Sequence, residues 1–183
     1  MKRNLLLMIL SCIILCFTFS GCGSNSGGSS TEDEAVRKFL NACYVSHDKK
    51  DIMYSIMPKE YWDYLVEVSG LPEDRIFYKT FGEYIGASND EELKSLEPDW
   101  LYEALEAKDF NDAMKKLKIE EKDDAEDEEY QYFNETLSHV DLMIDELYKA
   151  YTTDGYKGNL YKINDKWYYS KGWSWFEYGK QYD

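Results

Sequence analysis

The stretch LYKINDKWYY, residues 160–169, gives the clearest indication of the fold. Two runs rich in aromatic and aliphatic residues lie on either side of Asn164-Asp165. Runs of this composition are typical of β-strands, and a short polar pair between them favours a tight antiparallel turn. The sequence therefore predicts a β-hairpin near the C-terminus.

The register of this hairpin stays open at the level of sequence. A two-residue loop at Asn164-Asp165 is one solution. A three-residue loop is the other, and it would bring four large side chains together on one face: Tyr161, Ile163, Trp167 and Tyr169. Because strand side chains alternate between faces, a shift of one residue exchanges the two faces.

Before the hairpin, apolar residues recur at helical spacing. Thr31 is a suitable N-cap for a first helix, and Glu34, three residues later, can complete a capping box. The core-facing stripe of this helix consists of Val36, Phe39, Leu40 and Cys43. A second short apolar segment, 52–57, stops at Pro58. Further helical segments are expected at 58–69, 72–85, 90–96 and 98–117, with a candidate break at 107–112 in the last.

The longest helical pattern comes later in the chain. Its apolar positions are separated by gaps of four, three, four, three and four residues: Phe133, Leu137, Val140, Ile144, Leu147 and Tyr151. This spacing predicts a helix rather than a strand. The acidic run 120–129 before it is interpreted as a solvated loop or as the exposed first turns of that helix. These patterns predict an α+β class: one helix-rich globular domain, residues 31–183, with a C-terminal antiparallel β-hairpin.

The N-terminus has the layout of a secretion signal. Lys2 and Arg3 form a short cationic region, the apolar run 5–19 follows, and the small residues Ser20-Gly21 lie directly before Cys22. The apolar run is shorter than the roughly 20 residues that a permanent transmembrane helix needs. The sequence therefore predicts a signal peptide, residues 1–21, that is cleaved before Cys22.

Residues 19–22, Phe-Ser-Gly-Cys, resemble a lipobox, the cleavage and lipidation signal of bacterial lipoproteins, with Phe19 where leucine is usual. The resemblance implies a thioether-linked diacylglycerol on Cys22. The membrane is then a partner through the lipid anchor, and the protein lies on the extracytoplasmic side of the cell membrane. Cys12 comes too early in the apolar run, and Cys16 follows a large residue. A cleaved signal with a free Cys22 is the alternative.

The stretch after the signal predicts a tether and an acidic domain. Residues 22–30 are expected to be the lipidated cysteine and a flexible Gly/Ser linker. Loss of Lys2 and Arg3 with the signal takes the formal net charge from −15 to −17. Such a domain repels nucleic acid, so we expect no nucleic-acid partner. Cys43 is the one cysteine left without lipid, and it is interpreted as a buried core residue rather than a reactive thiol.

A second resemblance concerns the exported domain. An opening helix after a lipoprotein tether and a closing KINDKWYY hairpin, residues 162–169, resemble the NTF2-like and cystatin-like domains of exported lipoproteins. Such domains fold a helix against a curved antiparallel sheet and often enclose an apolar pocket, which the resemblance implies here. One evident hairpin is fewer strands than that fold uses. A mostly helical domain with a terminal hairpin is the competing interpretation.

The C-terminal tail is dense in aromatic residues. Aromatic rings can stack on sugar faces or surround quaternary ammonium groups. The candidate ligand-binding residues are therefore Trp167, Tyr169, Trp173 and Trp175. The tail also faintly resembles one copy of a choline-binding wall repeat. Packing of an aromatic hairpin in the core is the alternative interpretation.

No catalytic, cofactor or metal motif stands out in the sequence. His47 and His139 are the two histidines, and neither lies in a metal-ligand spacing, so we expect no metal and no cofactor. Two hypotheses remain. The first is a membrane-anchored, non-catalytic binding module for a peptide, sugar or protein ligand. The second is a small NTF2-like pocket enzyme of the hydrolase or isomerase type, which needs a buried carboxylate beside an aromatic wall.

Overall fold

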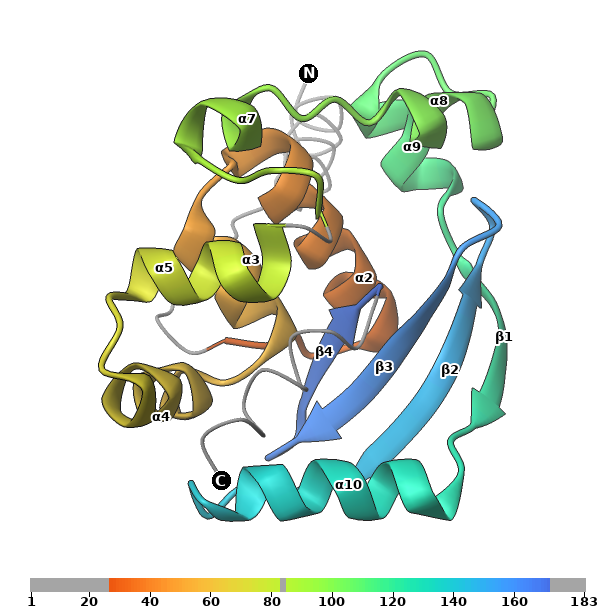
Figure 1. The fold of residues 1–183 in the computed structure, drawn as a ribbon. Coiled ribbons are helices and arrows are strands. Elements are labelled where there is room, and N and C mark those ends of the chain that lie inside the picture. The colour runs from red at the N-terminus through yellow and green to blue at the C-terminus, as the bar shows by residue number, and fades with distance from the viewer. Residues whose placement is uncertain (1–26, 83–84, 172–183) are drawn as a thin grey trace, which may run out of the picture.

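A computed structural model describes residues 27–82 and 85–171 and has the α+β class that the sequence predicts (Figure 1). A four-stranded antiparallel sheet has the strand order β1-β2-β3-β4. The strands are β1 (Ile119–Asp124), β2 (Glu146–Thr152), β3 (Lys157–Ile163) and β4 (Lys166–Ser170). The helices are α2 (Glu32–Asn41), α3 (Lys49–Ile56), α4 (Lys59–Ser69), α5 (Glu73–Phe77), α7 (Asp90–Lys94), α8 (Asp99–Ala104), α9 (Phe110–Lys116) and α10 (Asp127–Ser138).

The first helix begins where its cap predicts. The Thr31 hydroxyl accepts a hydrogen bond from the Glu34 N–H at 3.3 Å, and the Glu34 carboxylate reaches back to the Ser30 N–H at 3.2 Å. A π-helical turn, Ala42–Ser46, extends α2. The predicted apolar stripe is buried, and the prediction for Cys43 is confirmed: its side chain is 1% exposed, and burial raises the pKa of its thiol to about 12.

The remaining helices follow their sequence signals closely. Gly70 ends α4 with a φ of 62°, in the left-handed region that glycine adopts without strain. The segment 98–117 is broken as the sequence suggested, because α8 ends at Ala104 and α9 begins only after Asp109. The Asp109 carboxylate caps α9 by accepting a hydrogen bond from the Asp112 N–H at 2.9 Å.

The hairpin has the two-residue loop. Ile163 pairs with Lys166, and both Asn164 and Asp165 have positive φ, at 49° and 60°. Two such residues in a two-residue loop match the right-handed twist of the strands. Tyr161 therefore lies opposite Tyr168 on one face. The three-residue loop, which would have placed Tyr161, Ile163, Trp167 and Tyr169 on a single face, does not form.

The predicted helix from Phe133 to Tyr151 is wrong in its second half. α10 ends at Ser138, and the Ile144 N–H donates to the side-chain oxygen of Asn134 at 2.7 Å, which closes the connecting loop. Glu146–Thr152 is instead strand β2, paired with β1 on one side and β3 on the other. Pairing with a strand on each side satisfies the backbone hydrogen-bonding groups of β2. This pairing outweighs the helical apolar spacing, which continues through the loop only by chance.

The acidic run 120–129 is also structured differently from the prediction. Its first half belongs to strand β1, and its second half is the first turn of α10, as one of the two alternatives proposed. Every residue of β1 after Ile119 is exposed. An exposed edge strand can carry charge on both faces, so it shows no alternation of apolar and polar residues. The sheet therefore has two strands more than the predicted hairpin.

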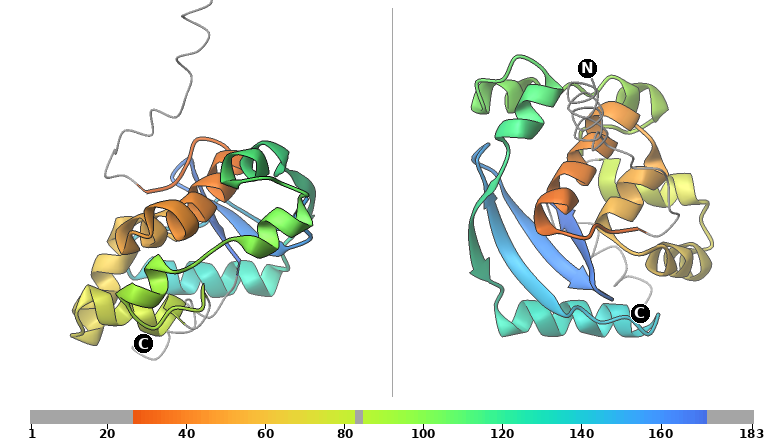
Figure 2. Two further views of the ribbon diagram at one scale, coloured as in Figure 1. Left: turned by 90° about the horizontal axis from the view of Figure 1, so that it is seen from above. Right: turned by 180° about the vertical axis from the view of Figure 1, so that it is seen from behind.

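Helices cover both faces of the sheet (Figure 2). Phe39 of α2 contacts Tyr169 edge-on at 5.7 Å between ring centroids, on one face. Phe133 of α10 contacts Tyr161 at 6.1 Å, on the opposite face. The core thus lies on both sides of β3 and β4. Within the described residues, no helix has the length and apolar character needed to cross a membrane.

The last part of the expected tether is not a free linker. The Ser29 N–H donates to the Trp167 carbonyl at 2.8 Å, and the Trp167 N–H donates back at 2.9 Å. The Lys38 ammonium donates to the Gly28 carbonyl at 2.8 Å. The prediction of a flexible linker over 22–30 is therefore wrong for residues 27–30, which lie along the outer edge of β4 and are called the docked segment. Only 23–26 separate Cys22 from this docked segment.

Gly28 is expected to be required for this docking. Its φ is 79°, and a Cβ there would lie 2.7 Å from the Cβ of Lys166. Gly28→Ala should release the segment, so we expect amide hydrogen exchange at Ser29 to quicken by about tenfold or more, as for a local opening. Gly86→Ala is the matched control, since Gly86 has a φ of 76° with no atom within 4 Å. Unchanged exchange at Ser29 in Gly28→Ala would contradict the docking.

Candidate functional site

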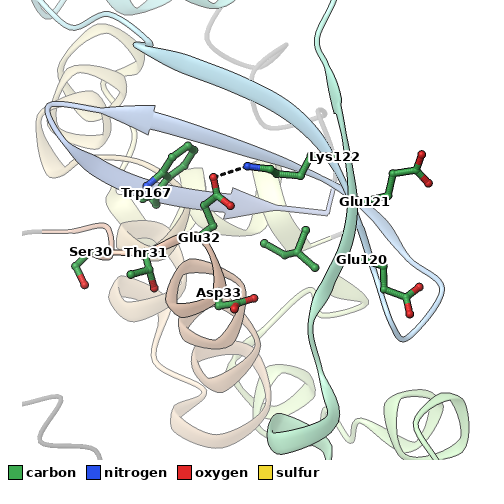
Figure 3. Close-up of a pocket in the computed structure, with 9 residues that line it drawn as sticks. Ser30, Thr31, Glu32, Asp33, Glu120, Glu121, Lys122 and Trp167 are labelled. Atoms are coloured by element: carbon green, nitrogen blue, oxygen red, sulfur yellow. Dashed lines mark hydrogen bonds and ion pairs between the residues drawn. The ribbon is translucent and has the colours of Figure 1, made fainter.

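An open groove of about 510 Å³ lies between α2 and β1 (Figure 3). Its lining residues come from the docked segment, the first turn of α2, strand β1 and the start of β4: Ser30, Thr31, Glu32, Asp33, Ile119, Glu120, Glu121, Lys122 and Trp167. The docked segment and β4 are joined by the Ser29–Trp167 bridge. Segments from the beginning, the middle and the end of the described chain therefore form one concave surface.

The bulge in β1 decides which charges face the groove. Its pairing with β2 shifts register between Ile119 and Glu121, and such a bulge can turn consecutive side chains to the same side. Glu120 and Glu121 both point away from α2, whereas Lys122 points toward it (Figure 3). The Lys122 ammonium lies 2.6 Å from the carboxylate of Glu32. This ion pair joins helix and strand across the groove.

Lys122 also lies over an aromatic wall. Its ammonium is 4.4 Å from the centroid of the Tyr148 ring, and that ring stacks on Trp167 at 6.2 Å with 29° between the planes. Stacked rings with a cation above them combine apolar area with a negative π-face. Of the two rings, Trp167 lines the groove and can contact an apolar part of a ligand, whereas Lys122 covers the face of Tyr148.

The hydroxyl end of the wall is fixed by a second ion pair. Tyr148 donates to the Glu146 carboxylate at 2.9 Å, and Lys162 donates to the same carboxylate at 3.0 Å. The hydrogen bond from Lys162 lowers the pKa of Glu146. The hydrogen bond to Glu146 raises the pKa of Tyr148 to about 12, so its phenol stays protonated at neutral pH. The aromatic wall is held in place without a titration step near pH 7.

The structure separates the predicted ligand-binding residues. Trp167 is 8% exposed and lines the groove. Tyr169 is 0% exposed and packs against Phe39, so for this residue core packing is the correct interpretation. Trp173 and Trp175, like the lipidation residue Cys22, lie outside the described residues. Of the two candidates that lie within the described residues, Trp167 contributes to the groove.

Sequence reasoning missed Glu32, Lys122 and Tyr148. Glu32 was part of a helix cap, Lys122 was the single cation in an acidic run, and Tyr148 lay in the segment interpreted as helix. The isolated lysine was the one available signal, because a single cation among carboxylates often marks a specific ion pair. Its partner, 90 residues away, has no local signature.

The charged side chains of the groove are open to solvent. The groove holds four carboxylates and one ammonium, and all four carboxylates stay accessible to solvent. Enzymes commonly place their acid–base carboxylates in buried sites that exclude water, and the groove carboxylates have no such surroundings. Among residues 27–82 and 85–171, no three His, Cys, Asp or Glu side chains are grouped to hold a metal ion.

Comparison with known proteins identifies no relative. No family model, no curated protein and no solved structure matches the chain. The site is therefore interpreted from its own geometry.

Proposed function

We propose that this chain is a bacterial lipoprotein, anchored through lipid on Cys22, whose folded domain is a non-catalytic binding module. The signal layout of residues 1–21 and the lipobox at 19–22 support the anchor. The groove between α2 and β1 supports the binding role. The resemblance to NTF2-like and cystatin-like domains belongs to the same proposal, because α2 packs on a four-stranded antiparallel sheet as that resemblance implied.

The docked segment would hold the groove close to the lipid. Five chain steps lead from Cys22 to Gly27, and they span at most about 17 Å when fully extended. Ser30, three residues later, already lines the groove. The domain would therefore sit on the membrane with the docked segment facing the headgroups. A ligand would meet the groove near the cell surface.

The charges of the groove favour a basic ligand. Lys122 pairs with Glu32, so Asp33 and the outward-pointing Glu120 and Glu121 leave the rim of the groove with excess negative charge, and Trp167 adds an aromatic surface. Complementary charge speeds encounter and selects the partner, while aromatic area adds affinity. We therefore propose a peptide segment that carries lysine or arginine next to an apolar residue. The binding proposal rests on the shape and charge of this groove.

The alternative of a pocket enzyme has less support. It requires a carboxylate buried beside an aromatic wall and facing a cavity. Asp154 is buried beside aromatic rings, but its carboxylate is paired with the Lys171 ammonium at 3.4 Å. The groove carboxylates, in contrast, are accessible to solvent. Binding without chemistry is the function that the geometry supports best.

A displayed library of random heptapeptides tests the proposal. We expect the mature chain in detergent to enrich peptides that contain lysine or arginine. For an enriched peptide, the double variant Glu32→Gln/Asp33→Asn should raise Kd by about tenfold, as expected for the loss of two close charge contacts of about 0.7 kcal/mol each. Fluorescence anisotropy of the labelled peptide measures this.

The matched control removes the same charge elsewhere. Glu67 in α4 and Glu103 in α8 are exposed and lie outside the groove. Glu67→Gln/Glu103→Gln should therefore leave Kd within about twofold, because distant exposed charges are screened by salt. Equal loss in both double variants would indicate general attraction to an acidic surface. That result, or a library without basic enrichment, would refute the groove as the site.

A further inference from the structure

A second site lies at the end of the sheet where β4 stops. The Lys171 ammonium lies over two adjacent aromatic rings, 3.6 Å from the Trp100 centroid and 3.8 Å from the Tyr156 centroid. The two rings meet edge-on at 4.5 Å. The carboxylate of Asp154 lies 3.4 Å from the same ammonium. We call Trp100, Tyr156 and Asp154 the ammonium box.

The carboxylate of the box is fixed from behind. The Asp154 side chain is 1% exposed. One of its oxygens accepts hydrogen bonds from the Thr152 hydroxyl and from the Tyr156 N–H, the latter at 3.3 Å. The other oxygen is the one that faces Lys171. The tight turn between β2 and β3 therefore aims one carboxylate oxygen into the box.

The rings of the box are fixed as well. The Trp100 indole N–H donates to the Tyr44 hydroxyl at 3.3 Å, and these rings also meet edge-on at 6.2 Å. Tyr156 forms the outer wall and is 45% exposed, so the box borders solvent. Two ring faces and a buried carboxylate are the groups that proteins use to bind alkylammonium ligands. The box is thus formed in advance for a cation.

Lys171 is an imperfect occupant of this site. Burial lowers the pKa of its ammonium to about 8, although Asp154 acts in the opposite direction. The loss of hydration thus outweighs the attraction of the box for this primary ammonium. A quaternary ammonium is more weakly hydrated and cannot lose its charge. A quaternary ammonium would therefore lose less hydration free energy than a primary ammonium when it enters the box.

We propose that the ammonium box is a binding site for alkylammonium ligands, best for a trimethylammonium group, and that Lys171 occupies it as an intramolecular competitor. The box is separate from the groove at α2 and β1, so this proposal stands independently of the groove ligand. A ligand that enters must displace Lys171, whose effective concentration is on the order of millimolar. Removal of that competitor should therefore expose the affinity of the box.

Choline tests the proposal directly. We expect Lys171→Ala in the mature chain to bind choline about tenfold or more tightly than wild type, as removal of an intramolecular competitor predicts. Isothermal titration measures this. The neutral isostere 3,3-dimethyl-1-butanol should not bind, because it lacks the charge. Choline affinity should be lost again in Lys171→Ala/Trp100→Ala, which removes one wall. A folded Lys171→Ala that binds choline no better than wild type would overturn the proposal.

Wild-type protein provides a second measurement that does not depend on the folding of the variant. Displacement by choline should expose the Lys171 amine, so its acetylation by a water-soluble activated ester, followed by mass spectrometry, should quicken with choline. The alcohol isostere should have no effect. Lys38 is the internal control, because it is held by the Gly28 carbonyl away from the box. Equal acetylation of Lys171 with and without choline would also overturn the proposal.

Discussion

Replacing Gly158 by alanine is expected to lower the free energy of unfolding by about 3 kcal/mol, at the upper end for overpacking in a core. A Cβ at this position of β3 would lie 2.4 Å from the end of the Tyr169 ring. That ring is 0% exposed and contacts Phe39 of α2 on the other side. It cannot move away without separating the helix from the sheet. Urea denaturation followed by far-UV circular dichroism measures the loss.

Two further variants check the cause of this effect. Gly155→Asn changes a glycine in the neighbouring turn, where no atom lies within 4 Å and asparagine tolerates the φ of 79°. It should cost less than about 1 kcal/mol. Tyr169→Leu shortens the clashing side chain, so Gly158→Ala should cost less in that background than in wild type. Equal costs in both backgrounds would contradict the proposed contact.

The parts of the fold that the sequence predicts well are those with local causes. Thr31 begins its helix and Gly70 ends its helix through bonds and dihedral angles within a few residues. The Asn164-Asp165 turn is likewise determined locally, by the positive φ angles of its two residues. Local signals of this kind need no knowledge of the rest of the chain.

The parts that sequence reasoning missed depend on distant partners. Leu147 and Tyr151 extend an apolar spacing that began in α10, yet they lie in β2 because β1 and β3 pair with it. Gly28 seemed suited to a flexible linker, but it permits close approach to the edge of β4. In both cases a tertiary contact decides between local options that are nearly equal in free energy.

The candidate sites show the same division. The aromatic tail directed attention to Trp167, which does line the groove, but its neighbours there come from α2 and β1. The ammonium box and its occupant bring together three separate segments: Trp100, the turn that carries Asp154 and Tyr156, and Lys171. No spacing in the sequence links these residues. Side chains that meet only through the fold leave no local pattern.

Loss of the proposed lipid anchor is the largest effect that we expect from any single substitution. A diacylglycerol on Cys22 would supply about 0.8 kcal/mol for each buried methylene, and its two chains would hold the protein on the membrane. Cys22→Ala removes the sulfur that carries them. We therefore expect the variant to lose the processed, lipid-bound form entirely. Cys43→Ala is the matched control, because Cys43 is buried in the folded domain and should not affect anchoring.

The most direct test of the lipoprotein proposal is the intact mass of the full-length chain after expression and membrane fractionation, beside Cys22→Ala. Our account predicts wild-type protein in the membrane fraction with an acylated N-terminal Cys22, and a variant that is uncleaved or mislocalised. Wild-type protein released without lipid would contradict it. The domain would then be an ordinary secreted one, and its partners would have to be sought away from the cell surface.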